Sequence, residues 1–272
     1  MRLIVVGSGI VGASCAYTAS SLGADVVLVD AAKPGRATAA GAGIICPWSA
    51  QVTDQAWCAL AYAAAREYPA LTARLAELGE TEVSYRQVGA LVLAERGEDQ
   101  ERIRLALTAR RAEVPEIGEV TGLSAADARR LFPPLRADAA AVYIGGAARV
   151  DGRELAAALA RSAARQGAVI RNGDAHLVCI SGRITGVRIG DELVEGDAVV
   201  AATGAWTRTF LQETGLAVPV EAQRGQIMHI SLAGVDTSPL AGRAARCQRP
   251  LPAGLRRRPD RRGRDPRDRL RS

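Results

Sequence analysis

The first thirty residues alternate between apolar runs and a segment with helical spacing. Residues 2–6 (RLIVV) are a short apolar, mostly β-branched run, which is typical of a buried strand. Residues 13–23 follow with helical spacing and close on Gly23, a residue that often ends helices. Residues 24–30 (ADVVLVD) form a second buried run that ends in Asp30. The pattern therefore predicts a strand, a helix and a second strand.

The middle of the chain predicts a mixture of helices and strands. Residues 54–79 carry the spacing of one or two amphipathic helices, with Pro69 as the expected break. Residues 83–95 predict two short strands, and residues 97–112 predict a charged helix. Ser124 is the expected N-cap of a further helix. This region shows no Ser/His/Asp or Cys/His constellation, so we interpret it as a mixed α+β domain without chemistry of its own.

The pattern predicts elements more clearly from residue 141 onward. Residues 141–173 predict a strand, a loop, a helix capped by Asp151 and another strand. One face of that helix carries Leu155, Ala158, Leu159 and Ser162. Residues 176–197 predict a three-stranded meander with glycine turns, and residues 198–206 predict a buried strand that ends in small residues and Trp206. The expected fold class is α/β, with a second, mixed-sheet α+β domain.

The turn between the first strand and the first helix carries a glycine motif with a known mechanism. Gly7 permits the tight turn, Gly9 lets backbone amides approach a diphosphate, and Gly12 lets the helix pack closely on the strand. The helix N-terminus supplies partial positive charge, and Asp30 at the end of the next strand accepts hydrogen bonds from ribose hydroxyls. The unit predicts a dinucleotide site in a Rossmann-type domain. The motif alone does not choose between NAD and FAD, so an NAD-dependent dehydrogenase is the alternative.

The excess of positive over negative charge is confined to residues 239–272. The 272-residue chain has a net charge of +6, but residues 239–272 hold 12 Arg and 3 Asp. The remainder is therefore mildly acidic, and the overall charge is no argument for nucleic-acid binding. A nucleic-acid arm would favour lysine and aromatic residues, and residues 239–272 contain neither. Their proline content and arginine repulsion predict disorder. We expect no nucleic-acid partner.

The cysteines and histidines narrow the chemistry further. Five cysteines lie at positions 15, 46, 58, 179 and 247, an odd number without a Cys-x-x-Cys pair. This favours packed thiols in a reducing compartment, and hence a cytoplasmic location. His176 and His229 are too few for a His-rich metal site, so we expect no metal. No apolar run reaches the roughly 18–20 residues of a transmembrane segment.

Four segments resemble one known family. Residues 33–47 (KPGRATAAGAGIICP) are similar to a loop of the FAD-dependent D-amino-acid oxidase/dehydrogenase (DAO) family, which includes glycine oxidase-like and sarcosine oxidase-like enzymes. Residues 149–168, 198–206 and 219–226 resemble further family segments. The chain departs from the family at Gly41, where many relatives carry asparagine. Arg224, Gly225 and Gln226 match a family motif, and we assign them no chemical role.

The resemblance implies a cofactor, a reaction and a set of binding residues. Family members bind FAD in an interrupted Rossmann-type domain and oxidise a small amine or amino acid by hydride transfer from its α-carbon to flavin N5. The catalytic residues stay unknown, because the cofactor carries the hard chemistry. The residues expected to bind FAD are Gly7, Ser8, Gly9, Ile10, Val11, Gly12, Asp30, Thr38, Gly43, Ile44, His176 and Gly204. Thr38, Gly43 and Ile44 are expected along the diphosphate-to-ring stretch, and His176 near adenine.

The same resemblance predicts the domains and an incomplete chain. Residues 1–50 and 141–215 form the expected FAD-binding domain, residues 51–140 and 216–238 a partial substrate domain, and residues 239–272 a disordered tail. Resemblance is expected to stop near residue 236, about a hundred residues short of a full family member. A single lysine among 35 basic residues suggests GC-rich coding DNA, so we interpret the tail as out-of-frame sequence. Such a chain is expected to bind FAD weakly and turn over little. Alternatively, residues 239–272 are a disordered spacer or a functional arm. For the whole protein, the alternative is a non-catalytic remnant of a frameshifted gene.

Overall fold

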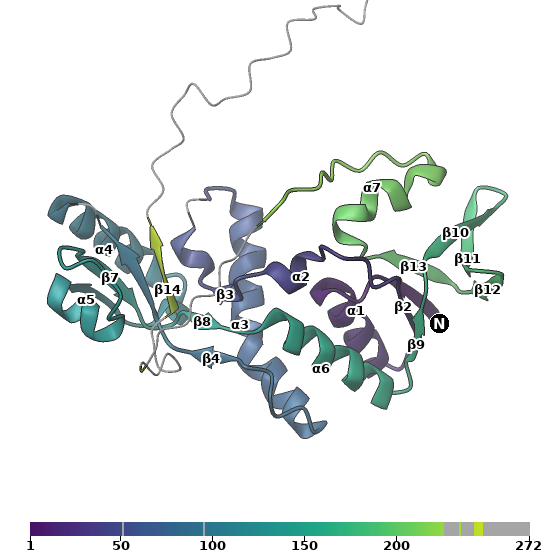
Figure 1. The fold of residues 1–272 in the computed structure, drawn as a ribbon, viewed down its shortest axis with the longest axis horizontal. Helices are drawn as coiled ribbons and strands as arrows, with labels where there is room; N and C mark the ends of the chain where they lie inside the picture. The colour runs from purple at the N-terminus through teal and green to yellow at the C-terminus, as the bar shows by residue number, and fades with distance from the viewer. Residues whose placement is uncertain (51, 95, 226–233, 235–241, 247–272) are drawn as a thin grey trace, which may run out of the picture.

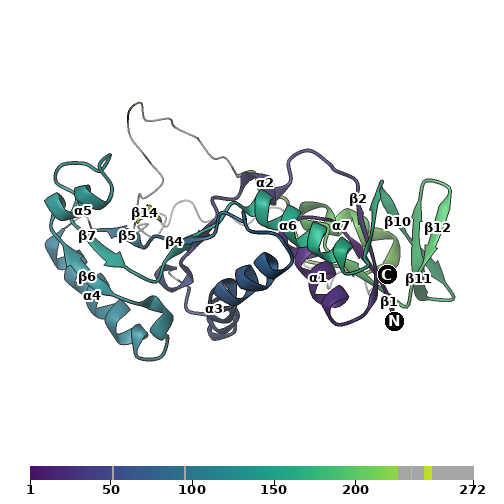
Figure 2. The ribbon, with the colours of Figure 1, turned by 90° about the horizontal axis from the view of Figure 1, so that it is seen from below.

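The computed structural model describes residues 1–50, 52–94, 96–225, 234 and 242–246. A parallel sheet with two long helices lies at one end of the molecule, and a second sheet with two helices lies at the other (Figures 1 and 2). The long helix α3 lies between them. The predicted α/β class with a mixed-sheet α+β part is therefore confirmed.

The parallel sheet has the strand order β13-β1-β2-β9. Its strands are β1 (Arg2–Val6), β2 (Asp25–Asp30), β9 (Val169–Asn172) and β13 (Ala198–Ala201). Helices α1 (Ile10–Ser21) and α6 (Gly152–Arg165) cover one face. The predicted meander of β10 (Ala175–Ile180), β11 (Arg183–Ile189) and β12 (Glu192–Glu195) covers the other. Both faces of β1 and β2 are buried, which explains their continuous apolar runs.

Side-chain alternation along β2 divides its residues between two cores. Val26 and Leu28 pack with the helices α1 and α6. Val27 and Val29 pack with the meander residues Val187 and Val194. The predicted apolar face of α6 is confirmed, because Leu155, Ala158, Leu159 and Ser162 are all buried. Packing on both faces of the sheet holds the ends of its strands in place, and the loops that follow the strands start from these fixed positions.

The second sheet has the order β14-β5-β7-β6. Strands β5 (Ala90–Leu93), β6 (Val120–Leu123) and β7 (Ala141–Ile144) are antiparallel neighbours. Helices α4 (Gly97–Arg111) and α5 (Ala125–Leu131) pack on them, and Ser124 caps α5 as predicted. Because β7 pairs with β5 and β6, residues 141–144 belong to this sheet and not to the dinucleotide-binding domain predicted for them.

Part of the predicted tail contributes a strand. Residues Gly242–Arg246 form β14, which pairs in parallel with β5. These five residues differ from the predicted disorder of residues 239–272, because the edge of β5 offers backbone hydrogen bonds. Residues 247–272 lie outside the described part of the chain.

A small sheet joins the two parts of the molecule. Strands β3 (Ile44–Ile45) and β4 (Arg86–Gln87) both pair with β8 (Ala148–Arg149). The short helix α2 (Ala37–Ala40) precedes β3, and α7 (Thr207–Phe210) follows β13. The 3₁₀ turns are η1 (Pro47–Ser49), η2 (Pro115–Ile117), η3 (Gly204–Trp206) and η4 (Gln212–Thr214).

Helix α3 (Gln55–Glu77) is continuous, so the predicted break at Pro69 is wrong. Its first half contributes Tyr62 and Ala65 to the core of the second sheet. Its last turns contribute Leu71 and buried Leu75 to the core under α6. Packing at both ends outweighs the hydrogen bond that proline removes.

A buried carboxylate ties the end of α3 to α6. Glu80 is only 7% exposed and accepts hydrogen bonds from Arg161 Nε at 3.0 Å and Arg165 Nη1 at 2.5 Å. The hydrogen bonds from Arg161, followed by those from Arg165, outweigh desolvation and hold the pKa of Glu80 below its ordinary value. Arg165 also donates to the carbonyl of Leu78 at 2.8 Å.

Glu80→Ala is expected to destabilise the protein by about 2 kcal/mol, because two charged hydrogen-bond donors lose their acceptor. The contribution of Glu80 is complete above its unfolded pKa of about 4.3 and disappears as the pH falls through the lower folded value. Urea unfolding at neutral pH and at about pH 3 measures both effects. Asp138→Ala is the control, since its partner Arg136 lies 3.5 Å away and both side chains are more than 70% exposed. Equal effects of the two substitutions would contradict the assignment.

Two remaining expectations concern the cysteines and the membrane. Cys15, Cys46, Cys58 and Cys179 are free thiols, and Cys247 lies outside the described residues. Among the described residues, no helix has both the length and the apolar character needed to cross a bilayer.

Candidate dinucleotide site

A cavity of about 1160 Å³ opens at the carboxyl ends of the parallel strands. Five segments line it: the β1–α1 turn, the β2–α2 segment, the β9–β10 turn, the chain from β13 through η4, and residues 220–223. Figure 1 shows α1, α2, α7 and β10 around this end of the sheet. The carboxyl edge of a parallel sheet is the usual place for a nucleotide ligand.

Gly7 in the β1–α1 turn and Gly12 in the first turn of α1 have no room for a side chain. Gly7 has φ of 104°, and a Cβ there would lie 2.4 Å from the carbonyl oxygen of Ala202. A Cβ at Gly12 would lie 1.7 Å from the carbonyl oxygen of Gly7. The sequence predicted that Gly12 lets α1 pack closely on β1. In the structure, Gly12 lets α1 lie close to the glycine turn that follows β1.

The N-terminus of α1 faces this cavity. Gly9 is its N-cap and provides no side-chain cap. The Ala13 amide is the first to bond back within the helix, to Gly9 O at 2.9 Å, so the amides before it point out of the helix end. The Ile10 amide donates to Thr38 Oγ1 at 3.0 Å. The geometry gives an anion site on backbone amides, with a hydroxyl beside it.

Asp30 joins the end of β2 to the glycine turn. Its carboxylate accepts hydrogen bonds from the Ser8 amide and the Ala32 amide, each at 2.6 Å, and lies 3.5 Å from Arg36 Nη1. Partial burial acts to raise the pKa of Asp30, but the Ser8 and Ala32 hydrogen bonds and the Arg36 charge outweigh it. The pKa therefore lies below its ordinary value. Asp30 is therefore ionised at neutral pH, and its carboxylate oxygens are able to accept hydrogen bonds from the hydroxyl groups of a ligand.

The structure brings most of the predicted binding residues to one cavity. The predicted residues that line it are Gly7, Gly9, Ile10, Val11, Asp30, Thr38, His176 and Gly204. Ser8 and Gly12 shape the turn from behind the lining, through the Ser8 amide and the close approach of Gly12 to Gly7.

Gly43 and Ile44 are not among the residues that line this cavity, and their position along the cofactor stays a prediction. Gly43 has φ of 66°, and a Cβ there would lie 1.7 Å from the carbonyl oxygen of Val150. Ile44 pairs with Arg149 in the small sheet. Both residues thus serve the packing of the segment that leads into α6.

Several residues that line the cavity are not among the predicted binding residues. The charged ones are Lys33, Arg36, Asp174, Glu213 and Glu221, and the large apolar ones are Trp206 and Phe210. Asp174 carried one usable signal, because it follows a predicted strand and the carboxyl ends of parallel strands meet at one edge. Lys33 carried another, as the only lysine in the chain.

The fold and this cavity define an α/β protein that binds a dinucleotide. The family model described as "FAD dependent oxidoreductase" (DAO) matches residues 2–263, and the chain belongs to this family. The match extends past residue 236, where we expected the resemblance to stop. It also decides the cofactor in favour of FAD over NAD.

Individual relatives agree with the family assignment. The chain is 39% identical over 234 residues to the uncharacterized oxidoreductase YurR of Bacillus subtilis, covering 86% of this chain and 63% of YurR. It is 31% identical over 245 residues to a glycine oxidase of Pseudomonas aeruginosa, covering 84% and 62%. The crystal structure of iminodiacetate oxidase from Chelativorans sp. BNC1 matches with a TM-score of 0.84 and 43% identity, covering 88% of this chain and 65% of that one. The chain thus spans somewhat less than two thirds of each relative.

The residues of the cavity fit FAD. The amides at the start of α1 suit a diphosphate, and the ionised Asp30 suits ribose hydroxyls. Val11 is 62% exposed at the same helix end, and Trp206 and Phe210 add further apolar surface to the lining. An exposed valine beside an anion site matches a ligand that carries both a diphosphate and large aromatic rings.

Proposed function

We propose that the protein is an FAD-dependent oxidoreductase that acts on a small amino acid or secondary amine. The observation that carries the proposal is the cavity in which Gly7, Asp30 and the α1 N-terminus converge. The family match supports it. When bound, FAD supplies a flavin ring that accepts a hydride from a carbon next to nitrogen.

The residues of the chain hold and orient the cofactor in this proposal. The amides at the start of α1 bind the diphosphate, and the Thr38 hydroxyl, now the acceptor for the Ile10 amide, is free to donate its proton to a phosphate oxygen. Asp30 binds the ribose and also fixes the Ser8 amide, so one carboxylate positions both the ligand and the turn beneath it. His176 and Gly204 line the same cavity. We assign no acid–base role to any residue.

The first substrates to test follow from the named relatives. One relative is an iminodiacetate oxidase and another a glycine oxidase, and both substrate names describe an amine one carbon away from a carboxylate. We therefore propose substrates of this chemical class. Iminodiacetate is the first candidate, since the identity to the iminodiacetate oxidase is 43% and that to the glycine oxidase 31%.

The proposal is tested by adding FAD to the purified chain and then adding substrate without oxygen. FAD is expected to bind saturably in the cavity, with competition by ADP. Bleaching of the flavin absorbance by iminodiacetate, by glycine or by D-alanine would rank the substrates. Binding of NADH in place of FAD, or no nucleotide binding at all, would contradict the proposal.

A further inference from the structure

An ion pair joins two of the segments that line the dinucleotide cavity. Lys33 Nζ lies 2.9 Å from Asp174 Oδ2. Lys33 belongs to the segment between β2 and α2, and Asp174 to the turn between β9 and β10. Both residues line the cavity, so the pair lies at its boundary.

The position of this pair is set by the sheet. Asp30 and Asn172 are the last paired residues of β2 and β9, and the Gly173 amide then donates to the Asp30 carbonyl oxygen at 3.0 Å. Lys33 and Asp174 are the first charged residues after the ends of the two strands. The ion pair therefore spans the two loops just beyond the carboxylate to which we assign the ribose.

We propose that the Lys33–Asp174 ion pair is a cofactor-retaining contact that closes over the adenosine half of bound FAD. The inference rests on the proposed function, because it takes the ribose to lie at Asp30. Because the charges of Lys33 and Asp174 neutralise each other, the pair does not attract the negatively charged diphosphate. It acts by linking the two loops between which the adenosine must pass. The side chains are 40% and 54% exposed, so we expect a modest effect on affinity, about threefold to fivefold.

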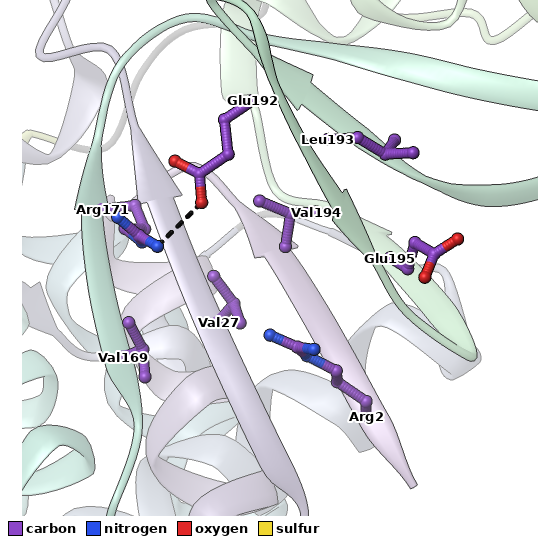
Figure 3. A pocket seen from close by; sticks show the side chains of 8 residues that line it. All are labelled: Arg2, Val27, Val169, Arg171, Glu192, Leu193, Val194 and Glu195. Atoms are coloured by element: carbon purple, nitrogen blue, oxygen red, sulfur yellow. Dashed lines mark hydrogen bonds and ion pairs between the residues drawn. The ribbon is translucent and has the colours of Figure 1, made fainter.

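A second ion pair of the same geometry provides a matched control. Arg171 Nη2 lies 2.9 Å from Glu192 Oε1, with exposures of 46% and 54%. Figure 3 shows this pair across a separate groove of about 430 Å³ between β9 and β12. The groove shares no lining residue with the dinucleotide cavity. Glu192→Gln therefore breaks an equivalent ion pair without touching the proposed cofactor contact.

The affinity test compares FAD dissociation from the full chain and its variants. Asp174→Asn and Lys33→Met are each expected to speed FAD release about threefold to fivefold, and the double variant no more than either one. Glu192→Gln is expected to leave the release rate unchanged. An unchanged rate in Asp174→Asn and Lys33→Met, or an equal increase in Glu192→Gln, overturns the inference.

A labelling test uses the fact that Lys33 is the only lysine in the chain. Acetylation by an amine-reactive reagent, followed by mass spectrometry, reports on this side chain and the N-terminus alone. FAD and ADP are expected to slow acetylation of Lys33, whereas FMN, which lacks adenosine, is not. Equal labelling with and without ADP overturns the inference while FAD binding is retained. A chain that binds no FAD overturns the proposed function and this inference together.

Discussion

Gly12→Ala is expected to destabilise the protein by about 3 kcal/mol and to abolish FAD binding. The new methyl group would lie 1.7 Å from the carbonyl oxygen of Gly7, and backbone at both positions would have to move. That movement separates α1 from β1 and displaces the amides at the helix N-terminus. Urea unfolding measures the stability, and titration with FAD measures the binding.

Gly97→Ala is the control for this substitution. Gly97 is the first residue of α4, its added Cβ would meet nothing within 4 Å, and its φ is not in the left-handed region. The change is therefore expected to be neutral or slightly stabilising. A Gly12→Ala chain as stable as Gly97→Ala would contradict the close packing of α1 on the glycine turn.

Asp30→Ala is expected to weaken FAD binding by about 30-fold to 100-fold. The substitution removes the proposed ribose acceptor and releases the Ser8 and Ala32 amides, a loss of roughly 2–3 kcal/mol for hydrogen bonds to a charged group. Isothermal titration with FAD and with ADP measures the change. Because Asp30 contacts the adenosine half in this proposal, both ligands are expected to lose affinity to the same degree.

Asp25→Ala provides the comparison on the same strand. Asp25 begins β2, at the end opposite Asp30, and its side chain forms an exposed ion pair with Arg2 at 3.4 Å. Its removal is expected to leave FAD affinity unchanged. If Asp30→Ala bound FAD as tightly as Asp25→Ala, Asp30 would have no part in the cofactor site.

The sequence predicted those features that depend on neighbouring residues. The glycine turn, α1 and β2 follow directly from a run of apolar residues, fixed glycines and a terminal aspartate. The caps at Ser124 and Asp151 were equally local, since each side chain bonds to amides two or three residues ahead. Turns and helix caps of this kind can be predicted from sequence because they depend on residues that are close together in the chain.

Features that depend on distant partners were not predictable in the same way. Pro69 stays inside α3 because the helix packs against two separate cores, one on either side of this residue. β7 has the same apolar pattern as a strand of the dinucleotide part, and only its pairing with β5 and β6 assigns it elsewhere. Gly43 fits a cofactor-binding loop by sequence, yet it is needed for an approach to Val150, more than a hundred positions further on.

The order of strands in the parallel sheet has a consequence for folding during synthesis. β1 and β2 emerge first, but their outer neighbours β13 and β9 are made only after the strands β5, β6 and β7 of the second sheet. Until then the apolar faces of β1 and β2 lack the meander and α6, and long-range pairing of this kind is slow. The glycine turn between β1 and α1 therefore gains the outer strands β9 and β13, whose ends line the dinucleotide cavity beside it, only late in translation.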